Sequence, residues 1–148
     1  MMPSSTTARP VRRRMRGITL LELMIVLVIV GIMGSLAYPQ YLNYRDRASR
    51  TEAKSALLNL LIDQERFYLN SSTFTNDLTD LGYSAASDWP TRSGTYLINV
   101  TSADTSNFTA TATYQGTGAE KDRCLTFTIT ADGSETSAPD TNCWTRTR

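Results

Sequence analysis

The sequence predicts an α+β protein in which one long N-terminal helix packs against an antiparallel sheet. Three observations lead to this prediction. A continuous apolar stretch covers residues 18–38. The segment that follows, to about residue 69, has apolar side chains that recur every three or four positions. Short segments rich in Thr and aromatic residues then occupy much of the chain from residue 95 to residue 138.

The apolar stretch is long enough to cross a membrane. From Ile18 to Tyr38 it contains no Lys, Arg or Asp, and its single acid is Glu22. About 20 apolar residues span a bilayer as a helix. Five arginines precede Gly17, and by the positive-inside rule this basic segment would stay cytoplasmic. We therefore expect a transmembrane segment at 18–38; a cleaved secretory signal and a plain signal anchor are the alternatives.

Glu22 needs its own explanation, because a carboxylate at the centre of a membrane helix costs roughly 2.5–3.5 kcal/mol. If the chain is cut between Gly17 and Ile18, the new ammonium group on Ile18 lies close to the depth of this carboxylate. The two charges can then neutralise each other, either within one chain at i, i+4 spacing or between neighbouring chains. In the second case Glu22 sets the register of an assembly.

Beyond Pro39 the helix becomes amphipathic. Pro39 cannot donate a hydrogen bond to the carbonyl of Ser35, so we expect a kink there. The helix is expected to run from residue 18 to about residue 69, and residues 70–94 to form a turn-rich loop with one helical turn. The helix face predicted to contact a head domain carries Ala53, Ala56, Leu57, Leu60, Leu61, Gln64, Phe67 and Tyr68.

Four strands are predicted after this loop. Residues 95–100, 107–115 and 124–130 have the β-branched and aromatic content of strands, and the last two segments alternate apolar with polar side chains. Residues 131–134, with the sequence ADGS, form a hairpin turn signal that leads to a short edge segment at 135–138. We expect a four-stranded antiparallel sheet with one face on the helix and a Thr-rich face towards solvent.

The composition argues against several classes of function. The chain has no histidine, which removes the commonest general base and the commonest metal ligand. Without residues 1–17, ten basic and fourteen acidic side chains remain, so a nucleic-acid partner is not favoured. Five basic side chains could still gather on the head and bind DNA: Arg92, Lys121, Arg123, Arg146 and Arg148.

Residues 16–22, with the sequence RGITLLE, resemble the class III signal of type IV prepilins. Such signals have a short basic leader, a Gly before the cut, an apolar first residue and a Glu at the fifth mature position. The likeness continues through residues 23–44 and includes Pro39, at the position of a helix-breaking proline. Ile18 is a departure, since phenylalanine is usual there. Residues 64–83 and residues 142–144, with the sequence NCW, resemble PilE-type minor pilins more closely than major pilins.

The resemblance implies that a prepilin peptidase removes the leader, residues 1–17, and that Ile18 is N-methylated. It implies that Thr19 and Glu22 take part in assembly, with Glu22 paired to the terminal amine of a neighbouring subunit. The expected partners are other pilin subunits, the peptidase and the inner-membrane assembly platform. The chain would be anchored in the bacterial inner membrane before assembly and would be extracellular, in the pilus, afterwards.

Cys124 and Cys143 flank the last predicted hairpin. Two cysteines in an exported domain are expected to form a disulfide, and without further Cys or His they cannot make a zinc site. A bridge at this place also resembles the C-terminal disulfide loop of type IV pilins. The head would then comprise residues 70–148 and end in this loop.

The predicted function is that of a minor pilin, a structural subunit that supports pilus assembly, twitching motility or adhesion. A type II secretion pseudopilin is one alternative, and a surface-exposed subunit for adhesion or DNA uptake is another. Some pseudopilin heads bind calcium through C-terminal acids, for which Asp132, Glu135 and Asp140 are the candidates; turn and solvated positions are the simpler interpretation. No cofactor, metal or catalytic residue is predicted.

Overall fold

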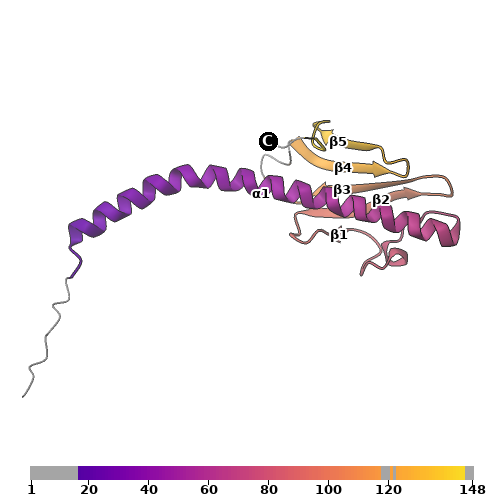
Figure 1. Ribbon diagram of the computed structural model, residues 1–148, viewed down its shortest axis with the longest axis horizontal. Coiled ribbons are helices and arrows are strands. Elements are labelled where there is room, and N and C mark those ends of the chain that lie inside the picture. Colours follow the sequence, from indigo (N-terminus) through magenta and orange to yellow (C-terminus); the bar gives the residue numbers. More distant parts are fainter. Residues whose placement is uncertain (1–16, 118–120, 122, 146–148) are drawn as a thin grey trace, which may run out of the picture. The chain divides into compact units, whose positions relative to one another are not determined.

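The computed structural model describes residues 17–117, 121 and 123–145. It contains the elements of an α+β fold in the predicted order, with the helix first and the strands after it (Figure 1). The elements are α1 (Leu20–Ser71), the short 3-10 helix η1 (Leu78–Leu81), β1 (Trp89–Pro90), β2 (Tyr96–Ala103), β3 (Phe108–Tyr114), β4 (Cys124–Thr130) and β5 (Glu135–Pro139).

Helix α1 confirms the predicted long helix with a shift of two residues at each end. It continues without interruption through Pro39, so the proline does not end the helix. The chain divides into two compact units at this residue, one up to Pro39 and one from Gln40 onwards. Proline has no backbone N–H, so the i→i−4 hydrogen bond that Pro39 would donate is missing from the helix. The boundary between the two units falls at this turn.

In the second unit, α1 lies across one face of the sheet (Figure 1). Its fully buried side chains are Ala53, Leu57, Leu60 and Gln64, which recur at intervals of four, three and four residues and so form one helix face. Ala56, Leu61 and Phe67, predicted for the same face, are partly buried. Tyr68, also predicted there, is 37% exposed because it lies near the end of the helix, where it stacks on Phe74.

The sheet has five strands, so the predicted number of four was wrong. The strands follow one another in the order β1-β2-β3-β4-β5, and each neighbouring pair is antiparallel. The missed strand, β1, pairs Trp89 with Ile98 and Pro90 with Leu97. Two residues are too few to show an alternating pattern, and proline is compatible with a strand only at a sheet edge, where β1 lies. The helical turn predicted in the loop is η1.

The two faces of the sheet follow the predicted alternation. Phe108, Ala110, Ala112 and Tyr114 are buried on the helix side. On the other face, threonines of β3 and β4 lie opposite one another in three pairs: Thr109 with Thr130, Thr111 with Thr128, and Thr113 with Thr126. Alternation along residues 124–130 predicts that Leu125 shares the buried face with Phe127 and Ile129, but Leu125 is only partly buried. An irregularity in register between Cys124 and Thr126 changes the alternation at this point.

A buried amide fastens the loop after α1 to the helix. Gln64 is fully buried, and its side chain accepts a hydrogen bond from the backbone N–H of Thr75 at 3.1 Å and donates one to the carbonyl of Thr75. The Gln64 amide thereby hydrogen-bonds both the backbone N–H and the backbone C=O of Thr75. Without these bonds, burial of the amide and of the two backbone groups would cost free energy. This contact fixes the path of the chain towards η1 and β1.

Candidate assembly site

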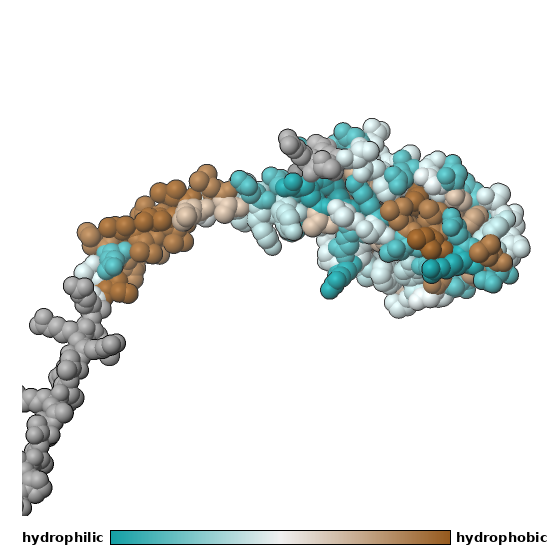
Figure 2. All heavy atoms as spheres, in the orientation of Figure 1, coloured by the Kyte–Doolittle hydropathy of each residue, from teal (hydrophilic) through white to brown (hydrophobic). Residues whose placement is uncertain are grey.

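The first part of α1 presents apolar side chains on every side. Each large apolar side chain from Ile18 to Leu36 is at least 51% exposed, and the corresponding part of the helix is coloured hydrophobic over most of its visible surface (Figure 2). By length and composition α1 is a candidate membrane span near the N-terminus. Exposure of an apolar surface of this extent to water is unfavourable in free energy, and soluble monomers rarely show it. Lipid or other apolar helices must therefore cover this surface.

Thr19 begins the helix as its N-cap. The backbone N–H of Glu22 donates to the Thr19 hydroxyl at 3.2 Å, and the N–H of Leu23 donates to the Thr19 carbonyl at 3.2 Å. Gly17 and Ile18 precede the helix, and both are exposed. The sequence interpretation assigned Thr19 only to assembly and missed this cap, although Thr followed three residues later by Glu is a capping-box signature.

The Glu22 carboxylate has no hydrogen-bond or ion-pair partner among residues 17–117, 121 and 123–145. It is nevertheless attached to a helix whose other neighbouring side chains are apolar. A charge in that setting is stable in a membrane or in a helix bundle only when an opposite charge neutralises it. The geometry therefore leaves the carboxylate available to a partner from another chain.

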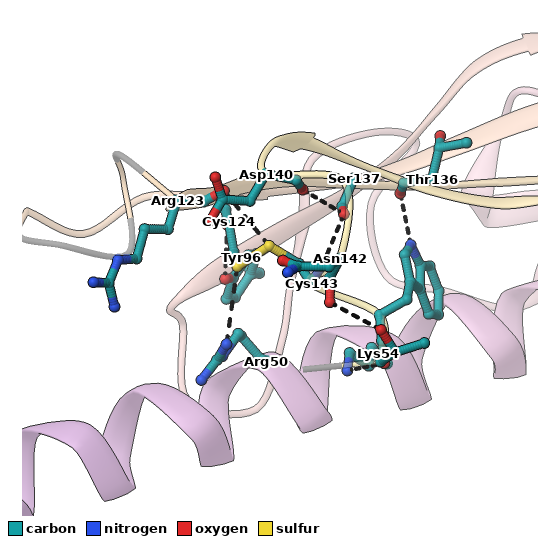
Figure 3. Close-up of a disulfide and its surroundings, with 12 residues drawn as sticks. Arg50, Lys54, Tyr96, Arg123, Cys124, Thr136, Ser137, Asp140, Asn142 and Cys143 are labelled. Carbon is teal, nitrogen blue, oxygen red and sulfur yellow. Dashed lines mark hydrogen bonds between the residues drawn. A yellow bond between two sulfur atoms is a disulfide. The ribbon is translucent and has the colours of Figure 1, made fainter. Parts of the chain in front are cut away.

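The predicted disulfide between Cys124 and Cys143 is present, and both cysteines are fully buried. The segment after β5 folds back over it (Figure 3). The hydroxyl of Ser137 donates to the carbonyl of Asp140 at 2.7 Å and accepts from the backbone N–H of Cys143 at 3.2 Å. The bridge thus ties the end of the described chain to β4 and β5.

Lys54 links the disulfide loop to α1. Its ammonium group donates to the carbonyl of Trp144 and lies 5.9 Å from the centre of the Phe127 ring. Burial, and then the nearby charge of Arg50, lower the pKa of Lys54. The Trp144 indole N–H donates to the Thr136 carbonyl at 2.6 Å, and its ring meets Phe127 edge to face. These contacts hold the loop against the helix and the sheet.

The three acids considered for calcium have different surroundings. The Asp132 carboxylate accepts hydrogen bonds from the hydroxyls of Thr130 and Ser134, which lower its pKa to about 2, so Asp132 is a turn residue. Glu135 lies in β5 opposite Ile129. Asp140 follows β5, and its N–H donates to the carbonyl of Arg123. Within the described ranges, no three Asp, Glu, Cys or His side chains form a metal-binding group.

The basic residues proposed for DNA contact are only partly described. Arg92, Lys121 and Arg123 have exposed side chains. Arg146 and Arg148 lie outside the described residues, as do residues 1–16 of the predicted leader. Arg92 occurs in the turn before β2, whereas Lys121 and Arg123 occur in the connection between β3 and β4.

A cleft of about 810 Å³ lies between α1 and residues 81–92, and the sequence interpretation missed it. The Tyr83 hydroxyl donates to the Asp63 carboxylate at 3.1 Å, and its ring meets Trp89 edge to face. Burial and the charge of Asp63 raise the pKa of Tyr83 to about 12. Arg66 and Arg92 also line the cleft. Its walls come from distant parts of the chain, so no local pattern could have revealed it.

An exposed apolar helix that continues into a helix-on-sheet head defines the class of prepilin-like proteins. Comparison with known families supports this class, because residues 12–38 match the prokaryotic N-terminal methylation motif. Residues 39–128 match the family described as type IV minor pilin ComP, DNA uptake sequence receptor. The chain belongs to this family of type IV minor pilins.

Its relatives include pilins and a pseudopilin. Over 90 residues the chain is 32% identical to the type IV major pilin protein PilA of Myxococcus xanthus, covering 61% of this chain and 39% of PilA. Over 70 residues it is 34% identical to the type II secretion system core protein G of Dickeya chrysanthemi, with 47% and 46% covered. Over 111 residues it is 34% identical to the fimbrial protein EcpC of Eikenella corrodens, with 72% and 67% covered. The chain thus spans less than half the length of the first two relatives.

Proposed function

We propose that this chain is a minor pilin of a type IV pilus and that its function is assembly, not catalysis. The observation that carries the proposal is the helix start within the methylation motif. There, the exposed residues Gly17 and Ile18 precede a capped helix whose first part is apolar. The one carboxylate between residues 18 and 38, on Glu22, has no partner among the described residues. A covered apolar helix alone would not require such a carboxylate.

In the proposed mechanism, a prepilin peptidase cuts the Gly17–Ile18 bond and the new terminus on Ile18 is N-methylated. The processed subunit carries an ammonium group at Ile18 and a carboxylate at Glu22, on an otherwise apolar helix end. When two helices pack side by side, the carboxylate of one subunit pairs with the ammonium group of the other. Pairing in the correct register satisfies both charges, and a shifted register leaves both unpaired, at a cost of several kcal/mol in an apolar setting.

The apolar part of α1 accounts for both proposed locations of the chain, first the inner membrane and then the filament. Before assembly, lipid of the inner membrane covers the apolar part of α1, and the assembly platform is the expected partner. In the filament, the helices of other pilin subunits cover it. The disulfide-closed head stays outside both apolar environments, because its apolar side chains already form a core of their own.

Mass spectrometry of the N-terminal peptide tests this proposal, on membranes and on sheared surface filaments from the same cells. We expect a peptide that begins at methylated Ile18 in both fractions for the wild type. Glu22→Val should be processed equally but strongly depleted from the filaments, because its terminal amine loses the opposite charge. Glu22→Asp is the matched control and should be incorporated better than Glu22→Val.

The other outcomes select among the alternatives. A processed peptide found only in membranes would favour the alternative that the chain is a pseudopilin. The similarity to the type II secretion protein of Dickeya chrysanthemi supports that alternative. An intact leader in both fractions would leave a signal anchor and end the minor-pilin proposal. Normal incorporation of Glu22→Val would contradict the role of Glu22 in register.

DNA binding by the head is a second candidate function, and the description of the matching family favours it. In this chain it would use the exposed side chains of Arg92, Lys121 and Arg123. The acidic excess of the chain beyond residue 17 opposes non-specific attraction of DNA. Binding therefore requires a local basic surface, and basic residues that contact phosphates make affinity depend steeply on salt.

The test measures the affinity of the full-length processed chain, in detergent micelles, for duplex DNA between 50 and 200 mM salt. Three phosphate contacts predict a slope of about −2.7 in log affinity against log salt. Arg92→Ala should make this slope shallower by about one. Arg66→Ala is the control, because Arg66 is an exposed arginine already paired with Asp63. A salt-independent affinity, or equal effects of both variants, would contradict the assignment.

A further inference from the structure

The cleft beside α1 has two rims, and one acidic side chain of the helix holds each of them. On one rim, the Tyr83 hydroxyl donates to the Asp63 carboxylate at 3.1 Å. On the other rim, the backbone N–H of Ser93 donates to the Glu52 carboxylate at 2.8 Å. Glu52 and Asp63 are about three helical turns apart on α1, or roughly 16 Å along its axis. The two hydrogen bonds fix both rims to one rigid element, so the fold itself forms the cleft of about 810 Å³.

The cleft has the size and the mixed lining of a small-molecule site. Such sites are usually concave, have volumes of about 300–1,000 Å³ and combine apolar walls with a few polar groups. Tyr83 and Trp89 line this cleft, and their rings meet edge to face. Ser55 and Ala56 line it from α1, where their short side chains leave space. The aromatic wall can therefore cover a flat apolar face of a ligand.

Two polar side chains at the cleft are available to a ligand. Within the part of the chain that the structure describes, neither the Asn59 amide nor the Arg92 guanidinium makes a hydrogen bond or an ion pair. Both side chains are exposed, so bound water can give way to a ligand. An amide both donates and accepts, and a guanidinium offers several donors in one plane. Together they suit a ligand that carries hydroxyl groups.

The charges at the cleft cancel. Glu52 and Asp63 contribute two carboxylates, and Arg66 and Arg92 contribute two guanidinium groups. Arg66 is already paired with Asp63 at 3.4 Å. A polyanion such as DNA gains little free energy from this lining, because the carboxylates offset the attraction of the guanidinium groups. The lining favours an uncharged ligand with an apolar face and a polar edge.

We propose that this cleft binds a neutral oligosaccharide whose pyranose rings carry equatorial substituents. The face of such a ring presents C–H groups, which pack on an aromatic side chain, and its hydroxyls lie at the edge, where they donate and accept. An axial substituent would lift the ring off the aromatic wall. Trp89 supplies the aromatic surface, and Asn59 and Arg92 hydrogen-bond the hydroxyls. All residues at the cleft belong to the unit from Gln40 onwards, so binding requires neither leader removal nor pilus assembly.

An NMR titration of the full-length chain tests this proposal, in micelles of a detergent without a sugar headgroup. Cellotriose and chitotriose are the probes, because their rings carry only equatorial substituents. The chain has two tryptophans, so its indole N–H resonances report on two places. The resonance of Trp89 should move on addition of either sugar. The resonance of Trp144 should stay, because its indole N–H is bound to the Thr136 carbonyl in the disulfide loop.

Two matched variants locate the site. Asn59→Ala should weaken sugar binding about fivefold, as expected for the loss of one hydrogen bond. The fold should tolerate this change, because the Asn59 side chain is exposed and has no partner among the described residues. Asn43→Ala is the control: it makes the same change at an exposed position of α1 that does not line the cleft, and it should bind like the wild type.

Three outcomes would overturn the inference. The first is a Trp89 resonance that does not move with either sugar at about 10 mM, well above a weak Kd of roughly 1 mM. The second is an equal effect of Asn59→Ala and Asn43→Ala on sugar binding. The third is a Trp89 resonance that moves with oligothymidine and not with the sugars, which would assign the cleft to DNA. None of these outcomes bears on leader removal or on the role of Glu22, so the proposed function is tested separately.

Discussion

Gly17→Val is expected to leave the chain uncut, with residues 1–17 still attached. A Cβ atom at Gly17 would meet no other atom within 4 Å, so the fold of this chain does not require a glycine there. Gly17 also lies outside the helix, where no left-handed conformation demands it. If glycine is needed, the need arises where the peptidase must approach the backbone closely, and a branched side chain blocks that approach.

The intact mass of the chain, measured after expression with the peptidase, decides this prediction. Gly31→Val is the matched control. It makes the same change in the apolar helix, and its Cβ atom would also meet nothing within 4 Å. Gly31→Val should therefore be cut normally. A mature-length mass from Gly17→Val would refute the cleavage site, and an uncut Gly31→Val would show that any added bulk in this region prevents processing.

The second large effect is expected from the disulfide. Replacement of both Cys124 and Cys143 by Ser should lower the free energy of unfolding of the head by about 3 kcal/mol, because the bridge closes a loop of roughly twenty residues in the unfolded chain. The loss should be somewhat larger in practice, since both positions are fully buried and two hydroxyls would need partners there. The end of the chain would lose its covalent tie to β4.

Denaturant unfolding of the full chain in micelles, followed by tryptophan fluorescence, measures this effect. Trp144 reports on the loop, because its ring packs on Phe127 and its indole binds the Thr136 carbonyl. Reducing agent supplies the control: it should lower the midpoint of the wild type and leave the double Ser variant unchanged. Equal stability of oxidised wild type and double variant would show that Lys54, Trp144 and the sheet hold the loop without the bridge.

Elements whose signal is local were predicted well. The apolar stretch and the three- and four-residue spacing that follows it placed the long helix within two residues at each end. Alternation placed Phe108, Ala110, Ala112 and Tyr114 on the buried face of β3. The Cys124–Cys143 bridge was also predicted, because two cysteines in an exported domain leave one pairing.

Features that depend on contacts between distant residues were not predicted. Strand β1 exists because Trp89 and Pro90 meet Ile98 and Leu97, and nothing in two residues indicates a strand. The cleft between α1 and residues 81–92 has the same origin. The buried amide of Gln64 was expected only as part of an apolar face, and its pairing with Thr75 depends on the return of the loop.

The sequence by itself determined the class of the protein, the long helix and the position of the proposed cut, because each follows from residues that are neighbours along the chain. Apolar runs, helical spacing and strand alternation act over a few residues and need no tertiary contact to be recognised. The tertiary structure decided the fifth strand, the cleft and the path of the loop after α1. In each of these, the free energy comes from burial and hydrogen bonds between segments that lie far apart in the sequence.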